Sequence, residues 1–78
     1  MIETVISLDS LDAVKEFNSA VLNNHGDVTL FSGRYIIDGK SIMGVLSMDL
    51  SKPIKVEIDD PVNKDVLNAI DKFRVETR

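Results

Sequence analysis

The sequence contains no cysteine and only one histidine. The lack of cysteine excludes a disulfide framework, a thiolate metal site and a thiol nucleophile. A single histidine cannot supply a cluster of imidazole ligands, and it gives no basis for a Ser-His-Asp arrangement. We therefore expect no metal, no other cofactor and no enzymatic activity, and the composition is compatible with the reducing cytoplasm, the compartment that we expect.

Long apolar runs and clustered basic residues are also missing. No stretch approaches the roughly 20 apolar residues of a transmembrane helix, and "MIETVISLDS", with Glu3, is not typical of a signal peptide. The nine Lys and Arg residues are scattered and the net charge is −4, whereas binding to a phosphate backbone depends on clustered cations. We expect a soluble protein that binds neither membranes nor nucleic acid.

What the sequence does contain is typical of one small globular domain spanning residues 1–78. Hydrophobic residues make up 44% of the 78 positions and charged residues 28%. This balance argues against disorder, and the length is just sufficient for one core.

The first third of the chain predicts a strand followed by a helix. Residues 2–7 are β-branched and precede a turn-like "LDS". Asp9 or Ser10 is placed to cap the helix, and Gly26 is a candidate for its left-handed C-cap. Spacings of three and four residues predict that one helical face is formed by Leu11, Val14, Phe17 and Val21.

The rest of the chain predicts three further strands and two further helices. Strands are expected at residues 27–31 and 34–37, joined by a tight turn at Ser32-Gly33, and at residues 54–58. A short helix is expected within "SIMGVLSM", and Asp60-Pro61 predicts the start of the last helix. Its apolar stripe comprises Val62, Val66, Ile70 and Phe73.

This β-α-β-β-α-β-α order predicts an α+β fold. Alternating strands and singly striped helices favour a two-layer, open-faced sandwich, in which a four-stranded antiparallel sheet carries three helices on one face. Many unrelated functions share this architecture, so the function must be argued from particular residues.

The stretch "KSIMGVLSMDLSK" resembles the HPr family, the small phosphocarriers of the bacterial sugar phosphotransferase system. Lys40 through Val45 match the family's Lys-Ser-Ile-Met-Gly-Val residue for residue. The inferred order of elements is also the order in that family, and "DVLNAIDKF" resembles its C-terminal helix more loosely. The resemblance implies an HPr-like fold over roughly residues 28–73 and a role in sugar transport.

The start of the chain departs from the family pattern Gly-x-His-x-Arg-Pro. Counting back from Ser41 without gaps places Leu8, Ser10, Asp12 and Ala13 at these four positions. A phosphoserine ester at Ser10 is too stable to pass its phosphate on, and Asp12 would repel the group that the family's arginine balances. His25 is expected at the far end of the helix, where the dipole disfavours phosphate. We therefore expect no histidine phosphocarrier activity.

Ser41 corresponds to the serine that a dedicated kinase phosphorylates in HPr proteins of many Gram-positive bacteria. A helix N-terminus tolerates a phosphate, and Lys40 adds a neighbouring cation. The alternative is that Ser41 only caps the helix. Asp49 and Pro53 stand where the family usually has glycines, in the loop that helps to form the kinase-facing surface.

The apolar residues of the same stretch have two possible roles. By the resemblance, Ile42, Met43 and Leu46 form an exposed patch that docks partner proteins, while Val45 and Met48 face the sheet. The alternative is that all five residues belong to the core.

Together these observations predict an HPr-like regulatory or adaptor module without carrier activity. It is expected to bind protein partners through Lys40, Ile42, Met43 and Leu46. Candidates for these partners are phosphotransferase-system proteins or a serine kinase. A diverged HPr-fold module that binds another ligand or partner is the alternative, and an accessory domain of an enzyme is a third. The carboxylate pair Asp59-Asp60 is expected to be a solvated cap and turn.

Overall fold

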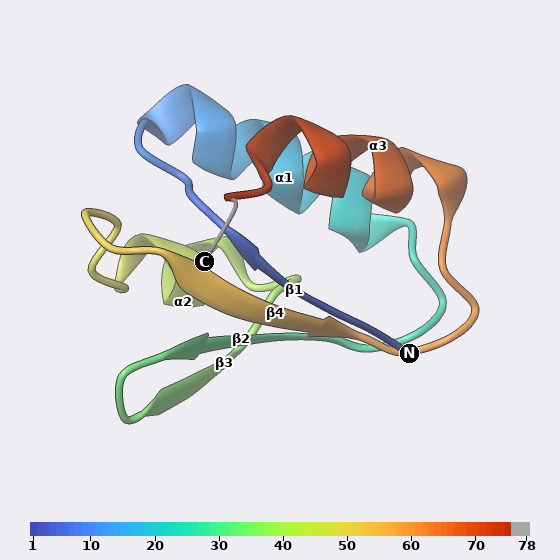
Figure 1. Cartoon of the computed structure of the whole chain (residues 1–78), viewed down its shortest axis with the longest axis horizontal. Helices are drawn as coiled ribbons and strands as arrows, with labels where there is room; N and C mark the ends of the chain where they lie inside the picture. Colours follow the sequence, from blue (N-terminus) through green and yellow to red (C-terminus); the bar gives the residue numbers. More distant parts are fainter. Residues whose placement is uncertain (76–78) are drawn as a thin grey trace.

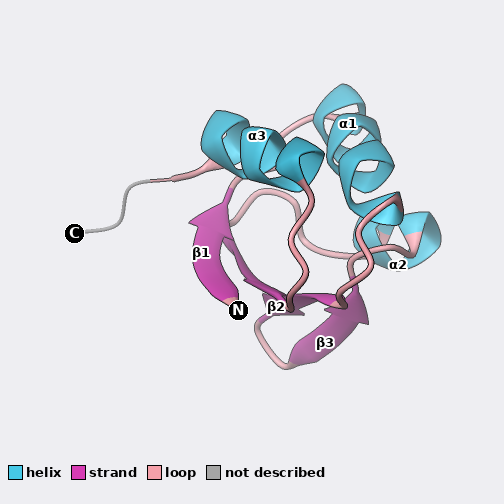
Figure 2. Cartoon of the chain, turned by 90° about the vertical axis from the view of Figure 1, so that its right-hand side faces the viewer, coloured by secondary structure: helices cyan, strands magenta, loops and turns pink. Residues whose placement is uncertain are grey.

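The computed structural model describes residues 1–75 and shows the expected α+β open-faced sandwich. Strands β1 (Ile2–Ile6), β2 (Val28–Ser32), β3 (Tyr35–Asp38) and β4 (Ile54–Ile58) form one antiparallel sheet in the order β1-β4-β2-β3. Helices α1 (Leu11–Leu22), α2 (Ile42–Leu46) and α3 (Lys64–Phe73) lie on one face of this sheet (Figures 1 and 2). The other face is left open.

The core lies between the sheet and the helices. Every second residue of β4 is buried on this side, and Ile54, Val56 and Ile58 are fully inaccessible while Lys55 is exposed. The alternation along β4 was therefore predicted correctly, because successive side chains of a strand point to opposite faces. Val14, Phe17 and Val21 of α1 complete this core as expected, but Leu11 is 52% exposed, so its predicted place on the buried face was wrong.

The β2–β3 hairpin turns one residue later than the sequence suggested. Ser32 pairs with Tyr35, so Gly33 and Arg34 form the two-residue turn, and Gly33 has the positive φ of 58°. Glycine adopts such a φ without steric cost, which explains why the turn centres there.

Gly26 does not end α1 with a left-handed residue. The helix ends at Leu22 with Asn23 as its C-cap, and Gly33 is the one glycine in residues 1–75 with a positive φ. Gly26 is needed for a close approach instead, since a Cβ built there would lie 1.8 Å from the carbonyl oxygen of Asp59. The segments before β2 and after β4 therefore touch backbone to backbone.

The last helix begins later than Asp60-Pro61. Asn63 is its N-cap, and the Asn63 side chain accepts a hydrogen bond from the Asp65 amide at 3.1 Å. Asp60 instead forms an exposed ion pair with the N-terminal ammonium group of Met1 at 3.0 Å. Of the predicted stripe, Val66 and Ile70 are buried and Val62 and Phe73 pack against the core. The charged end "RVETR" lies partly outside the described residues.

A buried asparagine, Asn24, connects the three helical segments through hydrogen bonds. Asn24 is 3% exposed; its side-chain amide donates to the carbonyl of Gly26 at 2.9 Å, and its oxygen accepts from the amide of Asn63 at 2.7 Å. Its own carbonyl accepts a hydrogen bond from the Lys40 ammonium at 2.7 Å. The end of α1, the start of α3 and the segment before α2 are thus held at one point.

Candidate functional site

Helix α2 positions the residues that the sequence singled out. Ser41 is its N-cap, and the Ser41 hydroxyl oxygen accepts from the Gly44 amide at 3.2 Å. The hydroxyl is on an exposed residue, so capping and accessibility coexist at this position. The same geometry also fits the alternative that Ser41 only caps the helix. Such a cap stabilises the start of a helix by about 1 kcal/mol.

The Lys40 side chain extends to the end of α1. Its ammonium group is held by the Asn24 carbonyl just beyond the end of α1, where cations are favoured by the unpaired carbonyls. Its backbone carbonyl accepts from the Asn18 side chain at 3.2 Å. Lys40 is half-buried and anchors the start of α2 to α1 through both contacts.

The apolar residues of α2 divide between the core and the surface. Met43 is 76% exposed and Leu46 is 41% exposed, and their spacing of three residues places them on one side of the helix. We call these two residues the α2 patch. Val45 and Met48 are buried, as predicted. Ile42 is only partly exposed because it packs against the core, and so departs from its predicted place in the exposed patch.

Gly44 allows α2 to sit directly on the sheet. A Cβ at Gly44 would lie 2.9 Å from a methyl group of Ile37 in β3 and 3.3 Å from the hydroxyl of Ser41. The glycine inside the motif therefore has a packing reason that the sequence pattern did not reveal. Its consequence is that one side of this short helix is pressed onto β3 and the side with the α2 patch faces solvent.

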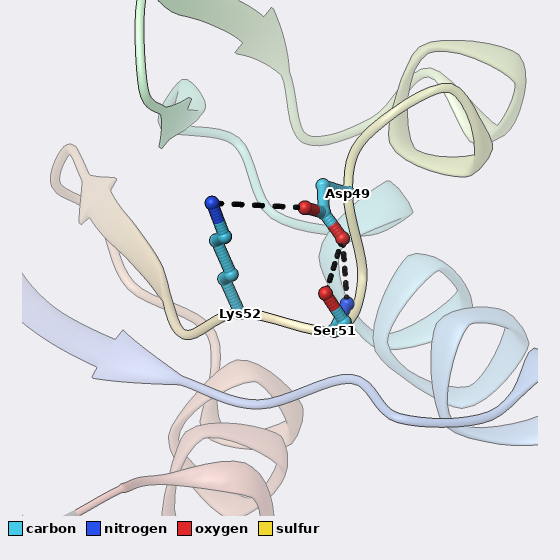
Figure 3. A network of polar contacts seen from close by, with 3 residues as sticks. All are labelled: Asp49, Ser51 and Lys52. Atoms are coloured by element: carbon cyan, nitrogen blue, oxygen red, sulfur yellow. Dashed lines mark hydrogen bonds and ion pairs between the residues drawn. The ribbon is translucent and has the colours of Figure 1, made fainter.

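The loop after α2 is ordered by Asp49. One carboxylate oxygen accepts from the hydroxyl of Ser51 at 2.5 Å and from the Ser51 amide at 3.1 Å, while the other lies 4.0 Å from the Lys52 ammonium (Figure 3). These hydrogen bonds, and more weakly the Lys52 charge, lower the pKa of Asp49 below its usual range. Asp49 therefore shapes the loop through its side chain.

A cleft of about 510 Å³ opens between this loop and the β2–β3 hairpin. Residues 32–35 and Ile37 line one wall, and residues 47–49 and Lys52 line the other. Its lining includes two basic residues, Arg34 and Lys52, together with Asp49 and Tyr35. Sequence reasoning missed the cleft because its two walls are distant in the chain.

Ser10 and Asp12 both lie at the start of α1, where Ser10 is the N-cap. The Ser10 hydroxyl oxygen accepts from the Ala13 amide at 3.1 Å and caps α1, as predicted, and Asp12 lies exposed in the first turn. His25 is exposed in the loop beyond the other end of α1, whose twelve residues span roughly 18 Å. The structure does not bring these residues together.

Within residues 1–75 no helix combines the length and apolar composition needed to cross a membrane. The same residues contain no group of three or more His, Asp or Glu side chains arranged to hold a metal ion.

Comparison of the chain with protein-family models, with curated proteins and with solved structures found no match.

Proposed function

We propose that this protein is an HPr-like regulatory or adaptor module that binds protein partners through the α2 patch and carries no phosphate on histidine. The observation that carries the proposal is the exposure of Met43 and Leu46 beside the capping Ser41. An exposed methionine and leucine on one helical face lose water favourably against a partner, and the flexible methionine adapts to differently shaped surfaces.

The absence of carrier chemistry follows from Ser10 and Asp12. A carrier needs a nitrogen that forms a labile phosphoramidate, and the hydroxyl of Ser10 forms only a stable ester. The negative charge of Asp12, exposed in the first turn of α1, opposes a phosphate there. The module would therefore bind partners without relaying phosphate.

Phosphorylation of Ser41 is the proposed regulation. A phosphate on this exposed hydroxyl would add about two negative charges immediately before the α2 patch. It would replace the hydroxyl that now accepts from the Gly44 amide, and a phosphate oxygen can accept the same bond. This negative charge would weaken binding to an acidic partner surface and strengthen binding to a basic one.

The test of regulation is mass spectrometry after two incubations. One contains phosphoenolpyruvate and the phosphotransferase that phosphorylates HPr proteins, and the other contains ATP and HPr serine kinase. We expect an acid-stable gain of one phosphate on Ser41 from ATP, absent from Ser41→Ala, and no gain from phosphoenolpyruvate. An acid-labile gain that maps to His25 would contradict the proposal.

The test of docking compares two matched variants. Met43→Asp places a charge in the α2 patch, whereas Leu67→Asp places the same charge on α3 at a leucine that is 42% exposed. The protein is titrated by nuclear magnetic resonance with the purified phosphoenolpyruvate-dependent phosphotransferase and, separately, with purified HPr serine kinase. Met43→Asp should abolish the binding seen with the original chain, and Leu67→Asp should preserve it. Equal binding by both variants would show that α2 is not the docking surface.

The alternative is an HPr-fold module that binds a small ligand outside phosphotransfer. The cleft between the hairpin and the loop after α2 favours it, because the same space is lined by an aromatic ring and two cations, one of which, Lys52, is paired with Asp49 at 4.0 Å. Such a lining suits a small anionic ligand with a flat apolar part. Binding of such a small anionic ligand that is lost in Arg34→Ala but kept in Met43→Asp would favour this alternative.

A further inference from the structure

The two edges of the sheet differ in whether they are covered. The outer edge of β1 pairs with the segment after α3: the Ser7 amide donates to the Phe73 carbonyl and the Val75 amide to the Val5 carbonyl, both at 2.9 Å. Ile6 and Arg74 form an antiparallel bridge between these bonds. Strand β3, in contrast, pairs within residues 1–75 with β2 only, and it forms the free lower edge of the sheet in Figure 1.

The hydrogen-bond pattern shows which backbone groups face this free edge. The Gly39 amide donates to the Val28 carbonyl at 2.7 Å, so the position after β3 is a hydrogen-bonded one. Bonded and non-bonded pairs alternate along an antiparallel ladder. Ile37 and Tyr35 are therefore bonded to β2, and the amide and carbonyl groups of Ile36 and the amide of Asp38 point outward.

The sequence of the edge lacks most devices that prevent strands from associating. Residues 35–38 include no lysine, no proline and no bulge, and their protection is limited to their shortness and the charge of Asp38. Ile36 is 71% exposed on the open face of the sheet. An exposed isoleucine beside unpaired amide and carbonyl groups is a template for another strand.

The edge is also complementary to itself in charge. Arg34 lies two residues before Ile36 and Asp38 lies two residues after it. An antiparallel pairing of two copies centred on Ile36 therefore places Arg34 opposite Asp38 of the partner subunit, once on each side of the symmetry axis. Opposite charges at directly facing positions stabilise a pair of strands, whereas like charges destabilise it.

We propose that two copies of this chain associate through β3, in antiparallel register with Ile36 facing its counterpart on a two-fold axis. The two four-stranded sheets then join into one continuous sheet of twice the width. The outward amide and carbonyl of Ile36 bond to the same groups of the partner subunit, and the Arg34 and Asp38 pairs flank them.

The open face supports this register. Ile36 pairs with Phe31, Phe31 with Lys55, and Lys55 with Val5, which forms one row across the sheet. The Lys55 ammonium lies 5.4 Å from the centre of the Phe31 ring and covers part of it. Association removes the exposed end of this row from water, because Ile36 meets the corresponding row of the partner subunit.

The first test is sedimentation of the full chain over a concentration series. Four residues per strand form a small interface, so we expect a reversible dimer with a Kd of roughly 10 µM to 1 mM. Arg34→Glu turns both charge pairs into repulsive ones and should raise the Kd by roughly tenfold or more. Lys15→Glu makes the same charge change on an exposed residue of α1 and should leave it unchanged.

A mixing experiment distinguishes this register from general stickiness. Arg34→Glu alone sets Glu against Asp38, and Asp38→Arg alone sets Arg against Arg34, so each variant should dimerise more weakly than the original chain. A mixture of the two restores opposite charges at both positions and should form heterodimers. Circular dichroism checks that each variant is folded, which matters because Asp38 also accepts a hydrogen bond from the Lys40 amide.

Cross-linking tests the two-fold axis directly. Because the chain has no cysteine, Ile36→Cys introduces the only thiol. Facing residues in a bonded pair have Cα atoms about 5.5 Å apart, which a disulfide spans. Mild oxidation should link Ile36→Cys into dimers faster than Tyr35→Cys, which faces residue 37. A single 8.7 kDa species at about 1 mM, or equal cross-linking of both variants, would overturn the proposal.

Discussion

Replacing Asn24 with alanine should remove about a third of the stability of this domain. The Asn24 side chain makes two hydrogen bonds, to the Gly26 carbonyl at 2.9 Å and from the Asn63 amide at 2.7 Å, and it is 3% exposed. Loss of each bond costs about 0.5–1.5 kcal/mol, and a buried group left without a partner costs about 1–3 kcal/mol. We expect the free energy of unfolding to fall by about 2–4 kcal/mol.

This loss is large for a chain of 78 residues. Domains have about 0.05–0.15 kcal/mol of stability per residue, which amounts to about 4–12 kcal/mol here. Urea unfolding followed by far-ultraviolet circular dichroism measures the change. With a slope of about 1 kcal/mol per molar urea, the midpoint should fall by about 2 M or more.

Two neighbouring asparagines provide controls for the Asn24 variant. Asn23 is exposed and its side chain has no hydrogen bond within residues 1–75, so Asn23→Ala should change stability by less than about 0.5 kcal/mol. Asn18 donates one bond to the Lys40 carbonyl at 3.2 Å, and Asn18→Ala should cost about 1 kcal/mol. If Asn24→Ala costs no more than Asn23→Ala, the Asn24 contacts do not join the helices as argued.

Three further predictions concern a glycine, a surface methionine and a carboxylate. Gly26→Ala should cost about 3 kcal/mol or more in urea unfolding, because its Cβ would overlap the Asp59 carbonyl; Gly33→Ala, with a positive φ but open space, should cost about 1 kcal/mol. Met43→Asp should leave the free energy of unfolding within about 0.5 kcal/mol, since Met43 is 76% exposed, and a larger loss would place this residue in the core. The Asp49 pKa, measured by nuclear magnetic resonance, should lie below the roughly 3.9 of a free aspartate and rise in Ser51→Ala. Because the folded pKa is lowered, the Asp49 contacts stabilise the protein above the unfolded pKa and are lost as the pH falls through the folded one; an unchanged pKa in Ser51→Ala would refute this cause.

Interactions between residues close in the chain could be predicted from the sequence. The alternation of β4, the buried stripe of α1 from Val14 to Val21, and the capping by Ser10 and Ser41 each depend on backbone periodicity or on bonds spanning three residues. The burial of Val45 and Met48 followed from the family resemblance. The order of elements and the open-faced sandwich were also predicted correctly, because alternating strands and striped helices have few ways to share one core.

Only the tertiary structure decided the features that depend on distant segments meeting. Gly26 is a glycine because Asp59 passes against it, and α3 begins after Asn63 because the Asn63 amide is held by Asn24, 39 residues away. The anchoring of Lys40 on α1 and the cleft beside α2 arise in the same way. The free edge of β3 is likewise invisible in the chain, since a strand's neighbours are chosen by long-range pairing rather than by its own residues.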